Sequence, residues 1–161
     1  MSTFWRQRPG GNPTPRLGAL SKPLLFATLS RSELRVIDAL LHERSYLEGE
    51  IIFDEGEEGQ ALHIVIAGRV LICRQGEPET GRITEIPAGV VFGELALLDN
   101  VPRSAQARAA ADCVLASLSR SDFETLVDTH AVIASKIALQ LARHLGRQLR
   151  SQASAADPRV L

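Results

Sequence analysis

The feature that most restricts the fold is the segment from Tyr46 to Leu118, where short apolar runs alternate with polar residues and are broken by glycine-rich turns. A period of two is typical of β-strands, whose successive side chains point to opposite faces of a sheet. Short strands joined by such turns predict a jelly-roll or a barrel. We expect strands near residues 50–53, 62–67, 69–74, 83–86, 90–92, 105–110 and 113–118.

Helical periodicity precedes this segment. Ser30-Arg31-Ser32-Glu33 is a capping box, in which a serine and a glutamate satisfy each other's free backbone amides at a helix start. Apolar residues follow at helical spacing from Leu34 to Leu41, so we expect a helix there. The residues from Pro23 to Phe26 predict a shorter helical turn before it.

Helical periodicity also follows the segment. Ser121-Asp122-Phe123-Glu124 is typical of a helix start, and a longer helix is expected after His130. This second helix carries an apolar stripe at steps of four residues. The stripe consists of Ile133, Ile137, Leu141, Leu145 and Leu149. The pattern therefore indicates a mainly β protein with helices at both ends, the last of them long.

The length of 161 residues fits one domain with two tails. Residues 1–22 are rich in proline and glycine and poor in apolar residues, which predicts a flexible N-terminal leader. Residues 23–150 form the expected domain, with its C-terminal helices from about residue 121. Residues 151–161 are small and polar, which predicts a disordered tail.

Residues 92–105 contain the elements of an anion site. Gly93 allows the backbone a close approach to a ligand, and the apolar residues after it can form one helical turn. The free amides of such a turn, here those of Gly93, Leu95 and Ala96, point toward an anion. Arg103 supplies a planar fork that matches phosphate oxygens. These residues together indicate a phosphate carried by a larger ligand.

Glu94 lies between these partly positive elements, where a carboxylate would repel a phosphate. A carboxylate accepts hydrogen bonds, so its natural partner at this place is a sugar hydroxyl. A site that needs both an anion holder and a hydroxyl acceptor indicates a nucleotide. Glu94 alone is equally compatible with a surface carboxylate, and Arg103 alone with a solvated charge. Their pairing around Gly93 and Pro102 favours the binding role.

The run Phe-Gly-Glu-Leu-Ala-Leu-Leu at 92–98 and Pro-Arg-Ser-Ala at 102–105 resembles the phosphate-binding cassette of cyclic nucleotide-binding domains. Such domains occur in bacterial catabolite activator proteins, in regulatory subunits of cAMP-dependent kinase and in cyclic-nucleotide-gated channels. Residues 49–56 and 62–70 resemble the early strands of the same family. The resemblance covers roughly residues 22–150, with the motif at 92–105 as its most specific part. We call residues 92–105 the cassette.

The resemblance implies a β-roll of about eight strands flanked by helices. It implies that Arg103 and Ser104 contact the cyclic phosphate and that Glu94 accepts from the ribose 2′-OH. Small Ala105 would let the next strand pass close to the ligand. The site residues that the resemblance implies are Gly93, Glu94, Leu95, Ala96, Arg103, Ser104 and Ala105.

The expected ligand is cAMP, with cGMP as the alternative, and no cofactor is expected. Family members selective for cGMP carry a threonine directly after the cassette arginine, where it can meet the guanine amino group. Ser104 occupies that position here, as in the catabolite activators that bind cAMP. Serine can make the same contact, so the expected preference for cAMP is modest.

The expected output is a movement of the last helix, coupled to ligand occupancy. In the resembling family this helix either joins two chains or folds over the base as a lid. The stripe from Ile133 to Leu149 favours a dimer seam slightly, and the alternative of a lid stays open. The catabolite activators continue into a DNA-reading helix-turn-helix. This chain stops eleven residues after Arg150, so we expect no DNA binding and an effector protein that the sequence does not identify.

Composition excludes several other classes. A net charge of −1 gives no broad footprint for nucleic acid or anionic lipid. The sequence has no apolar run of about 18 residues and no apolar signal core after Met1, so the cytoplasm is the expected compartment. Cys73 and Cys113 lie in strand-like runs and are expected to be buried free thiols.

Two further hypotheses belong to other classes. One is an interaction or dimerisation module that keeps the fold without a ligand, which the pairing of Glu94 with Arg103 disfavours. The other is an enzyme acting on nucleotides. The sequence offers no paired carboxylates and no nucleophile beside a base, so no catalytic residue is assigned. The four histidines are far apart and have no ligand spacing, so no metal site is assigned.

Overall fold

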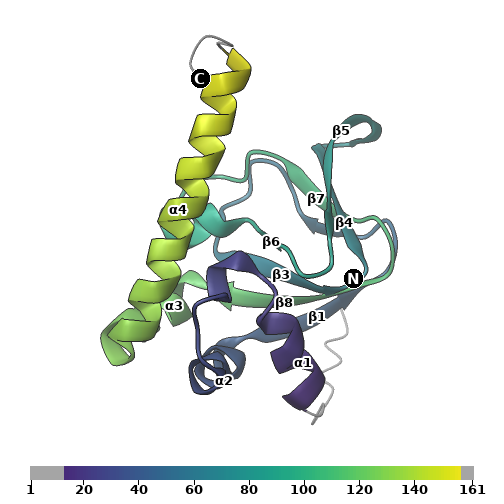
Figure 1. The fold of residues 1–161 in the computed structure, drawn as a ribbon. Helices are drawn as coiled ribbons and strands as arrows, with labels where there is room; N and C mark the ends of the chain where they lie inside the picture. The colour runs from purple at the N-terminus through teal and green to yellow at the C-terminus, as the bar shows by residue number, and fades with distance from the viewer. Residues whose placement is uncertain (1–12, 157–161) are drawn as a thin grey trace.

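The computed structural model describes residues 13–156 and shows a β-roll with helices packed on one side (Figure 1). The strands are β1 His42–Tyr46, β2 Ile51–Phe53, β3 Ala61–Ala67, β4 Arg69–Arg74, β5 Glu77–Pro87, β6 Val91–Phe92, β7 Gln106–Ala109 and β8 Cys113–Ser119. The helices are α1 Pro13–Leu20, α2 Arg31–Leu40, α3 Arg120–Thr129 and α4 Ala131–Ala156, with 3₁₀ turns η1 Leu24–Phe26 and η2 Glu94–Leu97. The mainly β architecture with flanking helices is confirmed.

The strands form two antiparallel sheets of four, in the orders β1-β8-β3-β6 and β2-β7-β4-β5. Between the sheets lies one apolar core, which includes Tyr46, Val65, Phe92 and Leu115. The outer face of the first sheet is covered by the helices, and this second core includes Phe26 and Leu118. The cassette runs between the two cores, because Phe92 belongs to the first and Leu97 to the second.

The N-terminal prediction is wrong for Pro13–Leu20, which form α1. Leu17 and Leu20 lie three residues apart on one helix face, and both are buried in the helix-side core. Pro13 and Pro15 fall in the first turn, where backbone amides have no helical partner, so proline is tolerated there. Residues 1–12 of the predicted leader lie outside the described residues.

The prediction for the C-terminal tail is wrong for residues 151–156, because α4 continues to Ala156. Alanine is the best helix former, and three of these six residues are alanine, so small side chains here extend the helix. Residues 157–161 lie outside the described part of the chain. Structured elements thus extend beyond the predicted domain limits of 23 and 150 at both ends.

Two strands differ from the expectation. β1 was not predicted, because every side chain of His42–Tyr46 except Tyr46 is exposed and the sequence shows no alternation there. It pairs with β8 at an edge of its sheet. β5 begins at Glu77, well before the strand expected near residues 83–86, and contains Pro78 and Gly81. β5 is also an edge strand, and edge strands tolerate proline because one side needs no ladder partner.

The helix starts follow local chemistry. Ser30 caps α2 through the predicted capping box with Glu33, which is confirmed. Glu33 also accepts two hydrogen bonds from Lys136 Nζ, at 2.8 and 3.0 Å, so the same carboxylate fixes α4 against α2. This contact with Lys136 holds the pKa of Glu33 below its ordinary value. α3 begins two residues earlier than predicted, with Ser119 as its cap.

The apolar stripe of α4 corrects the prediction of a dimer seam. Ile133, Ile137 and Leu141 are buried in the helix-side core of their own chain, with Leu145 packed at its edge and Leu149 67% exposed. These first three residues therefore cannot serve as a seam while the fold is kept. His130, with φ −138° and ψ 59°, separates α3 from α4. Both cysteines are buried free thiols, as predicted.

Candidate functional site

The cassette starts with a sharp turn at Gly93. Its φ of 69° and ψ of 24° lie in the left-handed region that favours glycine, and a Cβ there would lie 2.5 Å from Arg103 Nη1. The glycine thus makes room for the arginine of the same cassette, whereas the sequence suggested room for a ligand. The η2 turn follows directly, and the Ala96 amide already donates to Gly93 O at 3.3 Å. Leu95 is exposed and Ala96 is buried.

The Arg103 guanidinium is half-buried and held by backbone carbonyls. Nη1 donates to Gly93 O at 3.1 Å, and Nη2 donates to Ala61 O at 2.6 Å. The guanidinium carbon lies 4.1 Å from the centre of the Phe53 ring, in a cation–π geometry. Burial lowers the pKa of Arg103, while the charges of Glu57 and Glu94 oppose that shift. The arginine is therefore a cation in a fixed position.

The backbone around Arg103 is tied to the loop after β2. The Arg103 amide donates to Glu57 O at 2.7 Å, and the Gly56 amide donates to Arg103 O at 2.8 Å. Ser104 is exposed, and its carbonyl accepts from Arg74 Nη1 at 3.3 Å. Ala105 is buried, so its small side chain lies inside the roll as expected for a close passage of the strand.

Glu94 contacts the last helix. Its Oε1 lies 3.2 Å from His144 Nε2 of α4, and its side chain is only 14% exposed. The two residues also line a pocket of about 190 Å³. The other residues around this pocket are Lys22, Pro23, Leu24, Leu25, Gly89, Val90 and Val91. The predicted hydroxyl acceptor is thus engaged by a side chain from α4, a contact that sequence reasoning missed because no local pattern links residues fifty positions apart.

His63 of β3 is a second residue that the sequence did not single out. Its ring stacks against Phe92, with centroids 5.1 Å apart, and against Phe53 at 5.7 Å. Its Nε2 lies 3.4 Å from Arg103 Nη2, and its Nδ1 lies 2.7 Å from Ser117 Oγ. The sequence could have indicated His63, because it is a histidine at an inward-facing strand position among apolar neighbours.

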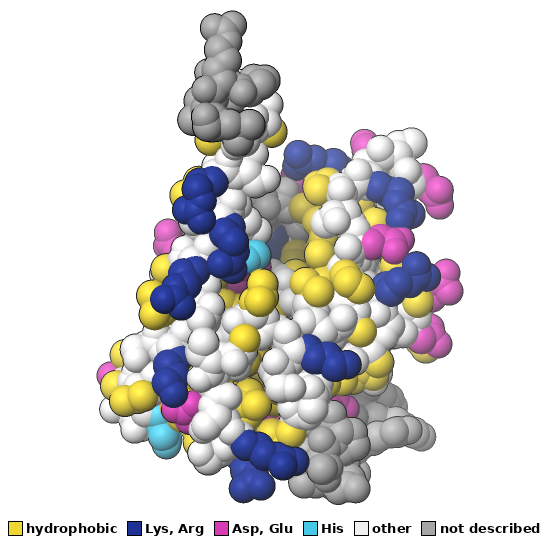
Figure 2. All heavy atoms as spheres, viewed as in Figure 1, with side chains coloured by type: hydrophobic (Ala, Val, Ile, Leu, Met, Phe, Trp, Pro, Cys, Tyr) yellow, Lys and Arg dark blue, Asp and Glu magenta, His cyan; other side chains and the backbone are white. Residues whose placement is uncertain are grey.

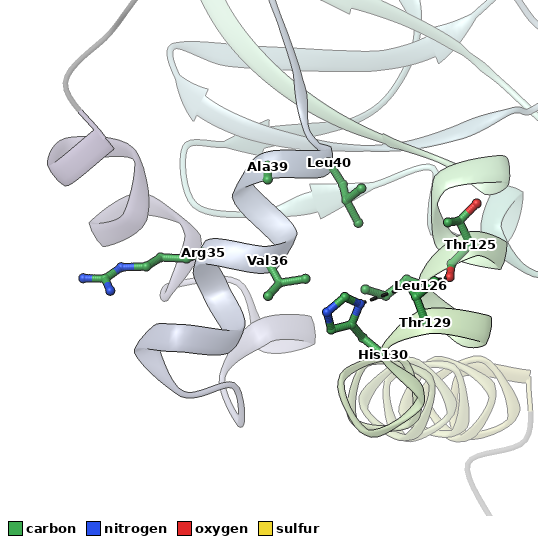
Figure 3. Close-up of a pocket in the computed structure, with 8 residues that line it drawn as sticks. All are labelled: Arg35, Val36, Ala39, Leu40, Thr125, Leu126, Thr129 and His130. Carbon is green, nitrogen blue, oxygen red and sulfur yellow. Dashed lines mark hydrogen bonds between the residues drawn. The ribbon is translucent and has the colours of Figure 1, made fainter.

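The larger pocket of about 450 Å³ lies elsewhere, between α2 and α3 (Figure 3). Arg35, Val36 and Leu40 line it from α2, and His130 closes it beside Thr129. The His130 Nδ1 lies 3.0 Å from Thr129 Oγ1, so the ring is occupied by a local contact. No residue of the cassette lines this pocket. We therefore take the cassette, and not the larger of these two pockets, as the candidate binding site.

Figure 2 shows a recess between the upper part of α4 and the roll, with basic side chains along the helix and apolar ones on the roll. Arg143, Arg147 and Arg150 are exposed on this part of α4. Within residues 13–156 no three histidine, cysteine or acidic side chains gather closely enough to hold a metal ion. No described helix combines the length and apolar character needed to cross a bilayer.

The comparisons with known proteins agree with this geometry. The family model of the cyclic nucleotide-binding domain matches residues 43–130. The cyclic AMP receptor protein of Thermus thermophilus is 36% identical over 124 residues, which are 75% of this chain and 56% of the relative. The chain thus spans little more than half the length of that curated relative.

Two solved structures share the fold. The Thermus thermophilus catabolite activator protein superposes with a TM-score of 0.73 at 33% identity, over 83% of this chain and 62% of the other. The regulatory domain of Toxoplasma gondii PKA, solved with cAMP, gives a TM-score of 0.63 at 26% identity, over 76% and 48%. This chain belongs to the cyclic nucleotide-binding domain family, a class of ligand-binding regulatory domains.

Proposed function

We propose that this domain binds a cyclic nucleotide, cAMP in preference to cGMP, and that occupancy is coupled to a movement of α4. The observation that carries the proposal is the convergence of Arg103 and Glu94 at the start of η2. The arginine lies against Gly93, the residue before Glu94, and the Glu94 charge is close enough to oppose the lowering of the Arg103 pKa. A cation and a carboxylate at this spacing fit a ligand that presents a phosphate and a hydroxyl together.

Arg103 has donors left for a phosphate. A guanidinium carries five N–H groups, and the three contacts with Gly93, Ala61 and His63 use three of them. The remaining donors give the phosphate a charge-assisted partner, and the exposed Ser104 hydroxyl adds a neutral one. The cyclic phosphate has a single charge, which matches a single arginine better than the larger charge of AMP or ATP would.

Glu94 supports the coupling to α4. Its Oε1 is engaged by His144, and the pocket between them measures about 190 Å³, whereas small-molecule pockets commonly measure about 300–1,000 Å³. A ribose hydroxyl therefore reaches Glu94 only if α4 or η1 moves away. The ligand and α4 thus compete for the Glu94 carboxylate. Because the ligand can bind Glu94 only in the conformation in which α4 has released it, binding shifts the equilibrium toward that conformation.

The preference for cAMP rests on Ser104, which takes the position where members selective for cGMP carry threonine. Names of relatives support the same ligand, because one is a cyclic AMP receptor protein and another was solved with cAMP. We assign no catalytic step to the domain, and its effector protein is not identified by the site.

The test is calorimetric titration of the protein with cAMP, cGMP and AMP in parallel. We expect cAMP to bind tightest, cGMP within about tenfold, and AMP much more weakly, since each 1.4 kcal/mol changes affinity tenfold. Recovery of intact nucleotide afterwards checks for turnover. Absence of binding by both cyclic nucleotides would overturn the function, and tighter binding of cGMP would overturn the preference.

A homodimer through α4 is the second part of the proposal, on a different face from the one expected. Val132, Leu139 and Leu149 are 65%, 52% and 67% exposed, and they lie at heptad positions a, a and d of one stripe. The small residues Ala142, Gly146 and Ala153 continue that stripe. A face of this kind allows two helices to approach closely.

Sedimentation tests the dimer. Leu139→Asp, which places a charge in the stripe, is expected to shift the mass toward the monomer, while Gln148→Asp on another face of α4 is the matched control. A wild-type protein that sediments as a monomer with and without cAMP would contradict the dimer and leave the nucleotide site untouched.

A further inference from the structure

The roll interior contains a row of hydrogen-bonded side chains that leads to Arg103, and two of its members have no role in the binding described above. It runs from Ser117 of β8 through His63 of β3 to Arg103 of the cassette. The two strands are register neighbours at this point, where His63 pairs with Ser117 and His63 also pairs with Phe92 of β6. The contact therefore depends on strand register and not on a mobile loop.

The hydrogen positions in this row follow from the chemistry of its ends. A guanidinium has only donors, so the His63 Nε2 that faces Arg103 Nη2 at 3.4 Å must be the accepting nitrogen. In a neutral imidazole the other nitrogen then carries the proton, and Nδ1 donates to Ser117 Oγ at 2.7 Å. Arg103 thus selects the tautomer, and the Ser117 hydroxyl stabilises it by accepting from Nδ1–H.

The ring is kept neutral by its surroundings. Burial between Phe53 and Phe92, together with the neighbouring charge of Arg103, lowers the pKa of His63 from its ordinary value of 6.5 to about 3. A protonated ring would lose its acceptor and place two cations side by side. At neutral pH the acceptor is therefore always present.

The stacking alone would not need a histidine. A phenylalanine at position 63 would fill the same space between Phe53 and Phe92, because those contacts are between ring faces. Only the nitrogen reaches Arg103, whose other anchors are the carbonyls of Gly93 and Ala61. The third anchor fixes the plane of the guanidinium and so the direction of its two uncommitted N–H groups.

We propose that His63 is a positioning residue for the phosphate-binding arginine: as the neutral Nδ1–H tautomer, held by Ser117, it accepts from Arg103 Nη2 and orients the guanidinium toward the ligand phosphate. The proposal rests on the proposed binding function and adds a residue that acts through Arg103 without touching the nucleotide.

His63→Phe is the main test, since it keeps the ring stack and removes only the nitrogens. We expect a roughly three- to tenfold loss of cAMP affinity by calorimetry, the size of one modest hydrogen bond. His63→Gln, whose amide oxygen can reach the position of Nε2, is the rescue variant and should bind more tightly than His63→Phe. Thermal unfolding of each variant checks that the roll is intact.

Coupling variants separate positioning from packing. Ser117→Ala should weaken cAMP binding by about two- to fivefold in the wild type and have no further effect in the His63→Phe background. Likewise, His63→Phe should have no further effect in the Arg103→Ala background, because its action runs through that arginine. Additive losses in these double variants would show a general effect on packing and overturn the proposal.

A readout without ligand completes the test. Nitrogen-15 NMR of the ligand-free protein should show the Nδ1–H tautomer of His63 from about pH 5 to pH 8, and Ser117→Ala should change that spectrum. An Nε2–H tautomer or a protonated ring would overturn the proposal. If the wild type bound no cyclic nucleotide, the proposed function would fall and this role with it. Normal wild-type binding with an unaffected His63→Phe variant would overturn only the role of His63.

Discussion

The two charges of the candidate site are held in opposite ways. Arg103 is fixed by the carbonyls of Gly93 in the cassette turn and Ala61 of β3, and by the Phe53 ring of β2. Glu94 is fixed by one side-chain contact with His144, which belongs to a separate helix. Under the proposed function, Arg103 is therefore the charge that stays in place and Glu94 is the charge that changes partner when the ligand binds.

Within the cassette, the chain passes from the interior of the roll to the η2 turn in three residues. Phe92 packs in the core between the sheets, and Leu97 is buried on the side of the helices. The η2 turn therefore connects the interior of the roll to the helical layer. A ligand that contacts both charges would therefore contact a cation held by the roll and a carboxylate held by α4.

The most direct way to break the comparison is Arg103→Ala, which removes the fixed charge. A hydrogen-bonded charged contact contributes roughly 1.5–3 kcal/mol, so cAMP affinity should fall about ten- to a hundredfold or more. Calorimetry measures the loss, and Arg69→Ala, which removes an arginine paired with Glu85 on the surface, is the control. If Arg103→Ala binds as tightly as wild type, the arginine is not the phosphate ligand.

Glu94→Gln removes the charge that contacts α4. We expect roughly tenfold weaker binding of cAMP but little change for a 2′-deoxy analogue, because only the first offers the hydroxyl that needs the carboxylate. Parallel titrations of both ligands measure this difference, with Glu85→Gln as the surface control. Equal losses for the two ligands would remove the assigned role of Glu94.

The burial of His63 beside Arg103 can be tested through the pH dependence of stability. His63 in the unfolded chain takes up a proton below about pH 6.5, whereas the folded ring resists protonation until its pKa of about 3. The unfolded state thus binds more protons in this window, and stability falls with falling pH by at most about 1.4 kcal/mol per pH unit from this group.

Denaturant unfolding of wild type and His63→Phe between pH 7 and pH 5 measures that contribution as the difference between the two slopes. The other histidines cancel in the comparison, and Glu33, whose pKa is also lowered, acts at lower pH. The variant should lose less stability on acidification. Parallel pH dependences would mean that the ring is solvated in the folded protein.

His144→Ala should produce the smallest effect and the only gain. It removes the contact that competes with the ribose, so cAMP should bind roughly two- to fivefold tighter, the usual size of a partly exposed pair. Arg147→Ala, an exposed neighbour on α4, is the matched control. Weaker binding by His144→Ala would mean that His144 helps the ligand instead of competing with it.

Local signals in the sequence predicted most of the fold. The capping box at Ser30 and the apolar runs of β3 and β4 depend on residues close together in the sequence. The bounds of these elements were therefore predicted to within about one residue. β1 was missed because an exposed edge strand has no alternation to show, and α1 because its prolines conceal a helix start. The apolar periodicity predicted helix α4, but it did not predict which part of the protein packs against its apolar stripe.

The candidate site was predicted only in part. The cassette is a contiguous motif, so Glu94 and Arg103 could be singled out from the sequence. Their actual partners, His144 and His63, lie fifty and forty positions away and reach them only through the packing of α4 and the register of β3. No sequence pattern encodes such pairings, because each is a consequence of the tertiary fold.

The position of α4 has one mechanical consequence. Its first half is clamped by the burial of Ile137 and Leu141 and by Lys136 on α2, while residues 142–156 extend for ~22 Å past the last buried side chain (Figure 1). A tilt of about 10° at that clamp would displace the far end sideways by roughly 4 Å. Under the proposed function, α4 would therefore act as a lever arm, and a small displacement at His144, close to the clamp, would grow toward the C-terminal end of the helix.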